Sequence, residues 1–344
     1  MFPLTHLVAK KKRLAKSRFS DVKRPSRQSA ACKLRSASRN NHASSSLLAG
    51  LMLEQQLINA LSLGSVYALF ALGFTLVFGV LGVINLSHGA IFMLGSYAAL
   101  LLVEKLALPL WLAMLAAMLI TGLIGLLVDF LVLKPLRQRN APHLIPMIAT
   151  IGVATMLTNL AQGLFGAENK RFPVGTIPED SASFGSVHVT AVQVGIVVIA
   201  FVLMLVLLVV MRRTQLGRAL RAIAESPKAA YLLGINVEGL FYLTSFAAAA
   251  LGGAAGVLVG LSFNAISPFM GQPMLHKGIA VIILGGMGDI RGAMIGGLFL
   301  GFAEVLTVAY ISSDFRDAVA FGLLFLILLV RPSGMFGKVL ERKA

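Results

Sequence analysis

The chain has 344 residues, of which 57% are hydrophobic and 13% are charged, and its formal net charge is +16. Soluble domains carry about 25% charged residues, and a soluble fold with a mean hydropathy of +0.86 would expose more apolar surface than water tolerates. The composition therefore excludes a soluble globular domain and predicts an all-α, polytopic integral membrane protein.

Residues 1–51 carry most of the positive charge, with 12 Lys and Arg against the single acidic residue Asp21. A segment rich in Lys, Arg, Ser and Ala without an apolar stripe is typical of a disordered tail. We expect either such a tail or a true protein start at Met52, directly before the first apolar run. Contact with anionic lipid head groups or a transit peptide are alternatives. Nucleic acid is not an expected partner, because no aromatic platform accompanies the charge.

The transmembrane domain is predicted over residues 52–340. A spanning helix needs about 20 mostly apolar residues, and eight runs approach that length, at about 57–81, 88–103, 109–133, 143–165, 190–211, 240–263, 291–311 and 316–330. A shorter run, 278–284, lies between Pro273 and the pair Gly285-Gly286. It is too short to cross alone, so we expect a broken or re-entrant segment buried in protein.

Three segments outside these runs are rich in Lys and Arg: 134–139, 212–228 and 331–343. Positive residues concentrate on the cytoplasmic side of membrane proteins, so all three are expected there. The connection 166–189 has mixed charge and is expected outside. The same parity places the start of the 57–81 span outside, unless the chain around 79–89 does not cross fully. The side of the N-terminus therefore stays open.

Polar side chains stand at the entrance to the second run, at Asn85, Ser87 and His88, followed by Gly89. Polar groups at membrane depth are costly unless they are paired, and they often face a cavity. These four residues are therefore candidates for the pore or substrate path. The alternatives are a helix cap at Asn85 or Ser87 and a structural hydrogen bond at His88. A metal site is not indicated, because His88 has no second ligand at helical spacing.

The cytoplasmic loop 212–238 is predicted to hold two short helices. Ser226-Pro227 is a helix start, with Ser as N-cap and Pro at the first helical position, and Gly234 is a helix stop. The second helix is expected to expose Ala229, Ala230, Leu232 and Leu233. A short helix with small and apolar residues on its surface suits a groove on a partner protein. The alternative is an amphipathic loop packed on its own bundle.

Gly288, Gly292 and Gly296 recur every four residues, which predicts a close helix-packing face. A phosphate-binding loop is disfavoured because no lysine follows and no strand precedes. Glu304 lies within an apolar run. It is interpreted either as a functional group or as a side chain hydrogen-bonded between helices.

Three motifs give the chain a resemblance to the branched-chain amino acid permease family of ABC importers. They are 83–90 with Met93-Leu94-Gly95, 217–235, and 285–288 with its following glycines. The resemblance covers about 53–340. In ABC permeases a cytoplasmic Glu-Ala-Ala…Gly loop contacts the ATPase, and here Lys228 stands where that pattern has Glu. The residues that this implies for ATPase coupling are Arg218, Glu225, Pro227, Ala229, Ala230, Leu233 and Gly234.

The resemblance implies a multi-pass subunit of the bacterial inner membrane that is not an enzyme and binds no cofactor, with ATP used by separate ATPase subunits. Its other expected partners are a second, related permease subunit, an external binding protein and membrane lipid. Leucine, isoleucine or valine is the implied substrate; urea or another amide, or another amino acid, is the alternative. A stand-alone ion-coupled carrier is a further alternative. It would need several intramembrane acids or bases, and the sequence offers only Glu304 and His88 as candidates, so this alternative is disfavoured.

Overall fold

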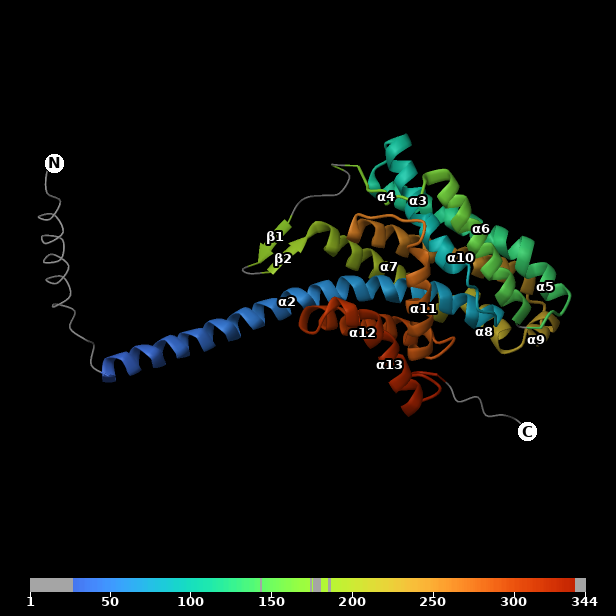
Figure 1. The fold of residues 1–344 in the computed structure, drawn as a ribbon. Coiled ribbons are helices and arrows are strands. Elements are labelled where there is room, and N and C mark those ends of the chain that lie inside the picture. The colour runs from blue at the N-terminus through green and yellow to red at the C-terminus, as the bar shows by residue number, and fades with distance from the viewer. Residues whose placement is uncertain (1–26, 143, 174, 176–180, 185–186, 338–344) are drawn as a thin grey trace, which may run out of the picture. The chain divides into compact units, whose positions relative to one another are not determined.

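The computed structural model describes residues 27–142, 144–173, 175, 181–184 and 187–337 and is almost entirely helical (Figure 1). This confirms the predicted all-α class. A short antiparallel hairpin, β1 (Ser181–Phe184) and β2 (Val187–Thr190), is the one pair of strands in the described part. The helices are α2 (Arg27–Leu81), α3 (His88–Leu106), α4 (Leu110–Val128), α5 (Lys134–Gln138), α6 (Leu144–Phe165), α7 (Ala191–Arg213), α8 (Gln215–Glu225), α9 (Pro227–Leu232), α10 (Val237–Phe263), α11 (Gly271–Gly285), α12 (Ile290–Tyr310) and α13 (Arg316–Val330).

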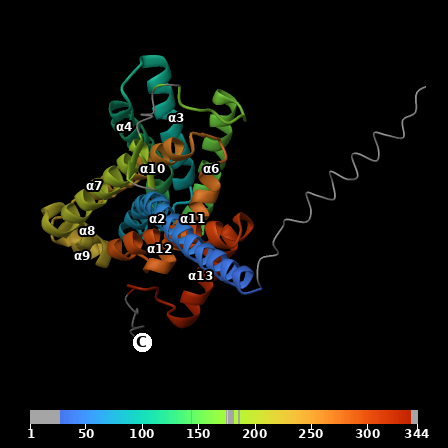
Figure 2. The same ribbon diagram turned by 90° about the vertical axis from the view of Figure 1, so that its left-hand side faces the viewer.

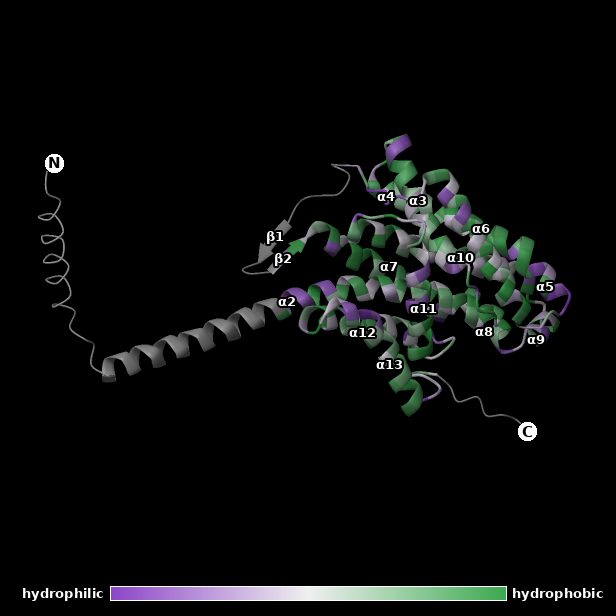
Figure 3. Cartoon of the chain, in the orientation of Figure 1, coloured by the Kyte–Doolittle hydropathy of each residue, from purple (hydrophilic) through white to green (hydrophobic). Residues whose placement is uncertain are grey.

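Seven helical segments in the described part are long and apolar enough to cross a membrane, and Figure 3 shows the predominance of hydrophobic residues along them. They match the predicted runs from 57–81 to 291–311. The eighth run, 316–330, forms α13, which has 15 residues. At 1.5 Å per residue such a helix is about 22 Å long, short of the roughly 30 Å hydrocarbon core. Of the eight expected spans, seven are therefore long enough to cross the membrane in the described part of the chain, and the eighth is the shorter helix α13.

The chain divides into two compact units, Met1–Leu53 and Glu54–Ala344. In the first unit the described residues, from Arg27 onward, are helical, and residues 1–26 lie outside the described residues. The disordered tail or later start expected for 1–51 stays a prediction. The segment from Arg27 is rich in Ala, Ser and Arg. A helix that is already nucleated propagates easily into such residues, because only the first turn carries the unfavourable nucleation term.

The centre of the bundle is built by α10 against α3 and α4 (Figure 2). Small residues on α10 allow this contact. A Cβ atom at Gly253 would overlap the side chain of Thr121 on α4, and one at Gly256 would overlap the carbonyl of Phe92 on α3. Lipid tails are as apolar as helix surfaces, so the hydrophobic effect does not drive helices together within the membrane. Helix association there depends instead on close backbone approach. Glycines of α10 therefore allow the close helix contacts at the centre of the bundle.

Two breaks in the helices lie inside the bundle. The first, 82–87, connects α2 to α3, and His88 at the start of α3 packs on Phe70, eleven residues before the end of α2. Eleven residues correspond to about 16 Å along the helix axis, so the connection runs back beside α2. The second precedes α11. That helix begins at Gly271, earlier than the predicted run 278–284, because Pro273 is tolerated in a first helical turn.

Candidate functional site

Four charged side chains meet between α2, α11, α12 and α13, around Glu304. Its Oε1 atom accepts hydrogen bonds from Lys277 Nζ at 2.7 Å and Tyr67 Oη at 3.0 Å, and also from Arg316 Nε. Asp317 lies 3.7 Å from Lys277 Nζ. Glu304 is 1% exposed, and its second oxygen, Oε2, has no hydrogen-bond partner in the structure. Glu304 is therefore hydrogen-bonded between helices, as one of its two interpretations predicts. Its Oε2 atom has no hydrogen-bond partner, so a functional role stays a prediction.

A cavity of about 460 Å³ adjoins this charged cluster. Glu304 and Arg316 form part of its wall. The rest of the wall combines polar and apolar side chains: Gln56, Asn59, Ser62, Leu63, Gln193, Ser262, Phe263, Val305, Val308 and Ala309. Asn59 and Gln193 are hydrogen-bonded to each other at 2.9 Å. The cavity thus joins a charged end to an apolar wall.

A second cavity, of about 490 Å³, lies between α3, α6 and α11. It is lined by apolar groups and backbone, with Thr155, Thr158, Asn159, Gln272 and His276 as polar members. No Asp, Glu, Lys or Arg belongs to its wall. Gly89, a predicted path residue, lines this cavity, close to the backbone of Gly271.

The other predicted path residues lie inside the protein. Asn85 Oδ1 accepts hydrogen bonds from Ser87 Oγ at 2.6 Å and from the Ser87 backbone N–H at 3.1 Å. This closes a local turn, and neither side chain caps α3, because the asparagine is satisfied two residues along. The His88 ring is 1% exposed, lies between Phe70 and Phe74, and has Nε2 3.4 Å from the Phe70 carbonyl oxygen. A role of these residues in the path stays a prediction.

The predicted helices of the cytoplasmic loop are present as α8 and α9, at the opposite end of the bundle from the β1–β2 hairpin (Figure 1). Ser226 caps α9 through the Ala229 N–H, Pro227 occupies the first turn, and Gly234 follows with φ +80°. The start and stop signals are therefore confirmed. Glycine suits this φ because it lacks a Cβ.

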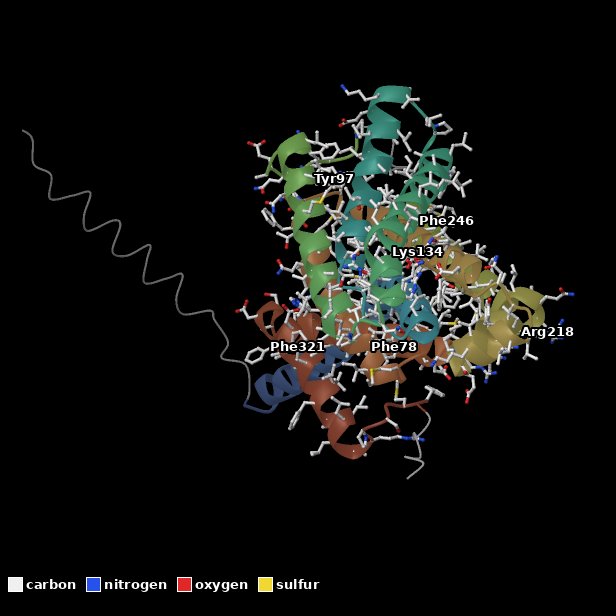
Figure 4. All side chains as sticks on the ribbon, turned by 90° about the vertical axis from the view of Figure 1, so that its right-hand side faces the viewer. Phe78, Tyr97, Lys134, Arg218, Phe246 and Phe321 are labelled. Carbon is white, nitrogen blue, oxygen red and sulfur yellow. The ribbon has the colours of Figure 1, made fainter. Side chains whose placement is uncertain are left out.

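The surface of α9 is strongly apolar. Tyr231, Leu232 and Leu233 are 72%, 84% and 79% exposed. The expected exposure of Ala230 is wrong: it is 1% exposed, because its position in the short helix turns it toward the bundle. The other predicted coupling residues are exposed: Arg218, Glu225, Pro227, Ala229, Leu233 and Gly234. Figure 4 shows Arg218 on α8 at the edge of the bundle. Coupling itself stays a prediction.

The glycine face of α12 is partly as predicted. Gly292 and Gly296 lie against α11, where a Cβ would meet the backbone around Gly285. Gly288 is not on this face. It has φ +86° and precedes the N-cap Asp289, whose Oδ1 accepts the N–H groups of Arg291 and Gly292. The four-residue spacing of Gly288 is therefore fortuitous, because the helix begins only after it.

A second buried ion pair lies where α4 continues into α5 through a π-helical turn, Asp129–Leu133. Asp129 is completely buried and accepts two hydrogen bonds from Arg137, at 2.7 and 3.1 Å. Lys134, which is labelled in Figure 4 and is closer to Asp129 in the sequence than Arg137 is, lies over the rings of Phe130 and Tyr242 instead. The bidentate geometry explains the preference for arginine over lysine.

Sequence reasoning missed Lys277 and Arg316 as partners of Glu304. Lys277 stands one residue before the short apolar run, and Arg316 stands at the start of the last one. An isolated charge in a membrane is costly. The positive residues at the edges of two apolar runs could therefore have been predicted as partners of the negative Glu304 within a third run. Among the described residues, no three His, Cys, Asp or Glu side chains lie close enough to hold a metal ion.

Comparison with known proteins matches residues 56–328 to the family described as branched-chain amino acid transport system permease component. The permease LivH of Salmonella typhimurium, from a high-affinity branched-chain amino acid transport system, is 38% identical over 83% of this chain and 95% of its own length. BraD of Pseudomonas aeruginosa is also 38% identical, with the same coverage. The probable LivH of Methanocaldococcus jannaschii is 29% identical over 81% of this chain and 90% of its own.

Proposed function

The chain belongs to the family of permease components of branched-chain amino acid transport systems, and from this premise we propose that it is the membrane subunit of an ATP-driven importer of leucine, isoleucine or valine. The observation that carries the substrate is the 38% identity to LivH and BraD over 95% of their lengths. The proposal includes localisation in the bacterial inner membrane, which is supported by the bacterial relatives and by the seven apolar helices of the described residues.

In this proposal ATP is hydrolysed by separate subunits that dock on α8 and α9. The exposed Tyr231, Leu232 and Leu233 support docking, because a contiguous apolar surface outside lipid favours burial against a protein partner. Arg212, Arg213 and Arg218 keep this surface on the cytoplasmic side, where ATP is available. Nucleotide-driven movement of α8 and α9 would be transmitted to the bundle through α7 and α10, the helices that flank them.

Two further partners complete the proposal. A second, related permease subunit would form the other half of the path. Many large apolar side chains on α4, α6 and α7 are exposed in the single chain, so lipid and a second subunit together have ample surface to cover. An external binding protein would deliver the amino acid, which accounts for substrate selection outside this subunit.

Uptake of radiolabelled leucine into membrane vesicles tests the function. We expect ATP-dependent uptake that needs the binding protein and is competed by isoleucine and valine. Preferential competition by urea or another amide would favour the alternative substrate. Uptake by the chain alone, without ATPase subunits, would instead indicate an ion-coupled carrier. The buried Glu304 cluster is the group that such a carrier would use.

A further inference from the structure

The cavity beside Glu304 lies near the helix ends that the charge pattern predicts at the outer face of the membrane. It is bounded by Gln56 near the start of the first span, Gln193 in the first turn of α7, and Phe263 at the end of α10. The other ends of α7 and α10 flank α8 and α9, the cytoplasmic helices. The cavity therefore lies at the side from which an imported molecule arrives, and its volume of about 460 Å³ falls within the roughly 300–1,000 Å³ of small-molecule pockets.

Two charged residues in the cavity wall, Glu304 and Arg316, have polar atoms without a hydrogen-bond partner. Glu304 uses only Oε1 for its three hydrogen bonds and leaves Oε2 unpartnered in a side chain that is 0% exposed. Among the described residues Arg316 donates through Nε alone, and a guanidinium carries five N–H donors. A buried acceptor without a partner is destabilising, and a ligand that supplies an ammonium group would satisfy it.

The apolar end of the cavity matches the rest of such a ligand. Leu63 from α2 and Val305 and Val308 from α12 line the same cavity as Glu304 and Arg316. An α-amino acid has an ammonium and a carboxylate on one carbon, so the two groups reach Glu304 and Arg316 together. A branched aliphatic side chain then contacts the apolar wall, where each buried methylene contributes about 0.8 kcal/mol.

We propose that this cavity is a binding site for a free branched-chain amino acid within the membrane subunit. The ammonium donates to Glu304 Oε2, the carboxylate accepts from the terminal nitrogens of Arg316, and the side chain lies against Leu63, Val305 and Val308. The inference rests on the proposed function and adds to it an initial substrate-binding site on the import path. The cavity at α3, α6 and α11 does not compete for this role, because no charged side chain lines it.

A photoactivatable diazirine analogue of leucine tests the site in membranes that contain the full chain with its transport complex. We expect the label on peptides that contain Leu63, Val305 or Val308. Leucine should compete with it, whereas isovaleric acid, which lacks the ammonium, and isopentylamine, which lacks the carboxylate, should not. Glu304→Gln preserves the shape but removes the charge, and should lower labelling about tenfold or more.

A second variant guards against misfolding of the charged cluster. Val308→Trp fills the cavity without touching an ion pair and should also abolish labelling. Ile295→Trp is its matched control, on the same helix, similarly exposed (46% against 42%) and outside the cavity. Asp129→Asn disturbs a different buried ion pair and should leave labelling unchanged.

Vesicle uptake of leucine, measured in parallel, separates the site from the function. Label elsewhere in the chain, label that both variants retain, or no label in vesicles that take up leucine would overturn the site and leave the function intact. Absence of both label and leucine uptake would overturn both. Loss of label on Glu304→Gln and Val308→Trp, with retention on Ile295→Trp, is the result that supports the site.

Discussion

Truncation of Leu232 provides the sharpest test of the proposed docking on α9, because this side chain is 84% exposed and lies on a helix predicted to face the cytoplasm. Leu232→Ala removes the equivalent of three methylene groups, each worth about 0.8 kcal/mol when buried. Scaled by the exposed fraction, the loss on docking is about 2 kcal/mol. A difference of 1.4 kcal/mol is tenfold in affinity, so the ATPase subunit should bind about 30-fold more weakly.

The assay is titration of the purified ATPase subunit onto the permease complex in nanodiscs, with the dissociation constant as readout. Leu205→Ala is the control: it makes the same change on α7, at a position that is 59% exposed within an apolar span. An exposed side chain in an apolar span is expected to contact lipid or another membrane protein, so its effect on ATPase binding should be negligible. The docking argument is refuted by a change below about threefold for Leu232→Ala, or by an equal change for both variants.

Three further outcomes are expected. Asp129→Asn leaves Arg137, whose side chain is 17% exposed, without its charged partner; the loss should be smaller than the roughly 3–5 kcal/mol typical of a fully buried charge, and the melting temperature in detergent should fall. Gly256→Val would push a side chain into the Phe92 carbonyl and should prevent folding or assembly, measured by size-exclusion chromatography; Gly152→Val, at a position with open space, should not. Gly234→Ala forces a Cβ onto φ +80°, a strain of about 1 kcal/mol or more, and should lower transport-coupled ATPase activity while spans and expression stay unchanged.

The sequence predicts the spans well because their signal is local. Twenty apolar residues in succession identify a membrane helix without knowledge of its neighbours. The α9 helix is equally local, since Ser226, Pro227 and Gly234 each act within one turn. For the same reason the position of Gly288 was predictable in principle: Asp289 is a good N-cap, and a glycine before an N-cap lies outside the helix.

The sequence does not predict the tertiary contacts between these side chains. The partner of Asp129 depends on a π-helical turn that brings Arg137, not Lys134, into bidentate reach. The partners of Glu304 come from three other segments of the chain, up to 237 residues away. Apolar periodicity carries no information on such pairings, because it specifies which face of a helix is buried but not which helix covers it.

The contrast between the two polar clusters bears on where the import path runs. Asn85 Oδ1 and Ser87 are hydrogen-bonded to each other, whereas Glu304, in the wall of a cavity, has one oxygen without a partner. Packing of α11 on α12 does not require charges, since hydrophobic residues of similar volume usually stabilise a buried site as well as an ion pair or better. A carboxylate with one free oxygen therefore has no purely structural advantage over such residues. Under the proposed binding site, a zwitterion gives these charges a role beyond packing, and the import path runs beside α12. A role of the residues at the start of α3 in the path stays a prediction, and Gly89 lines the second cavity.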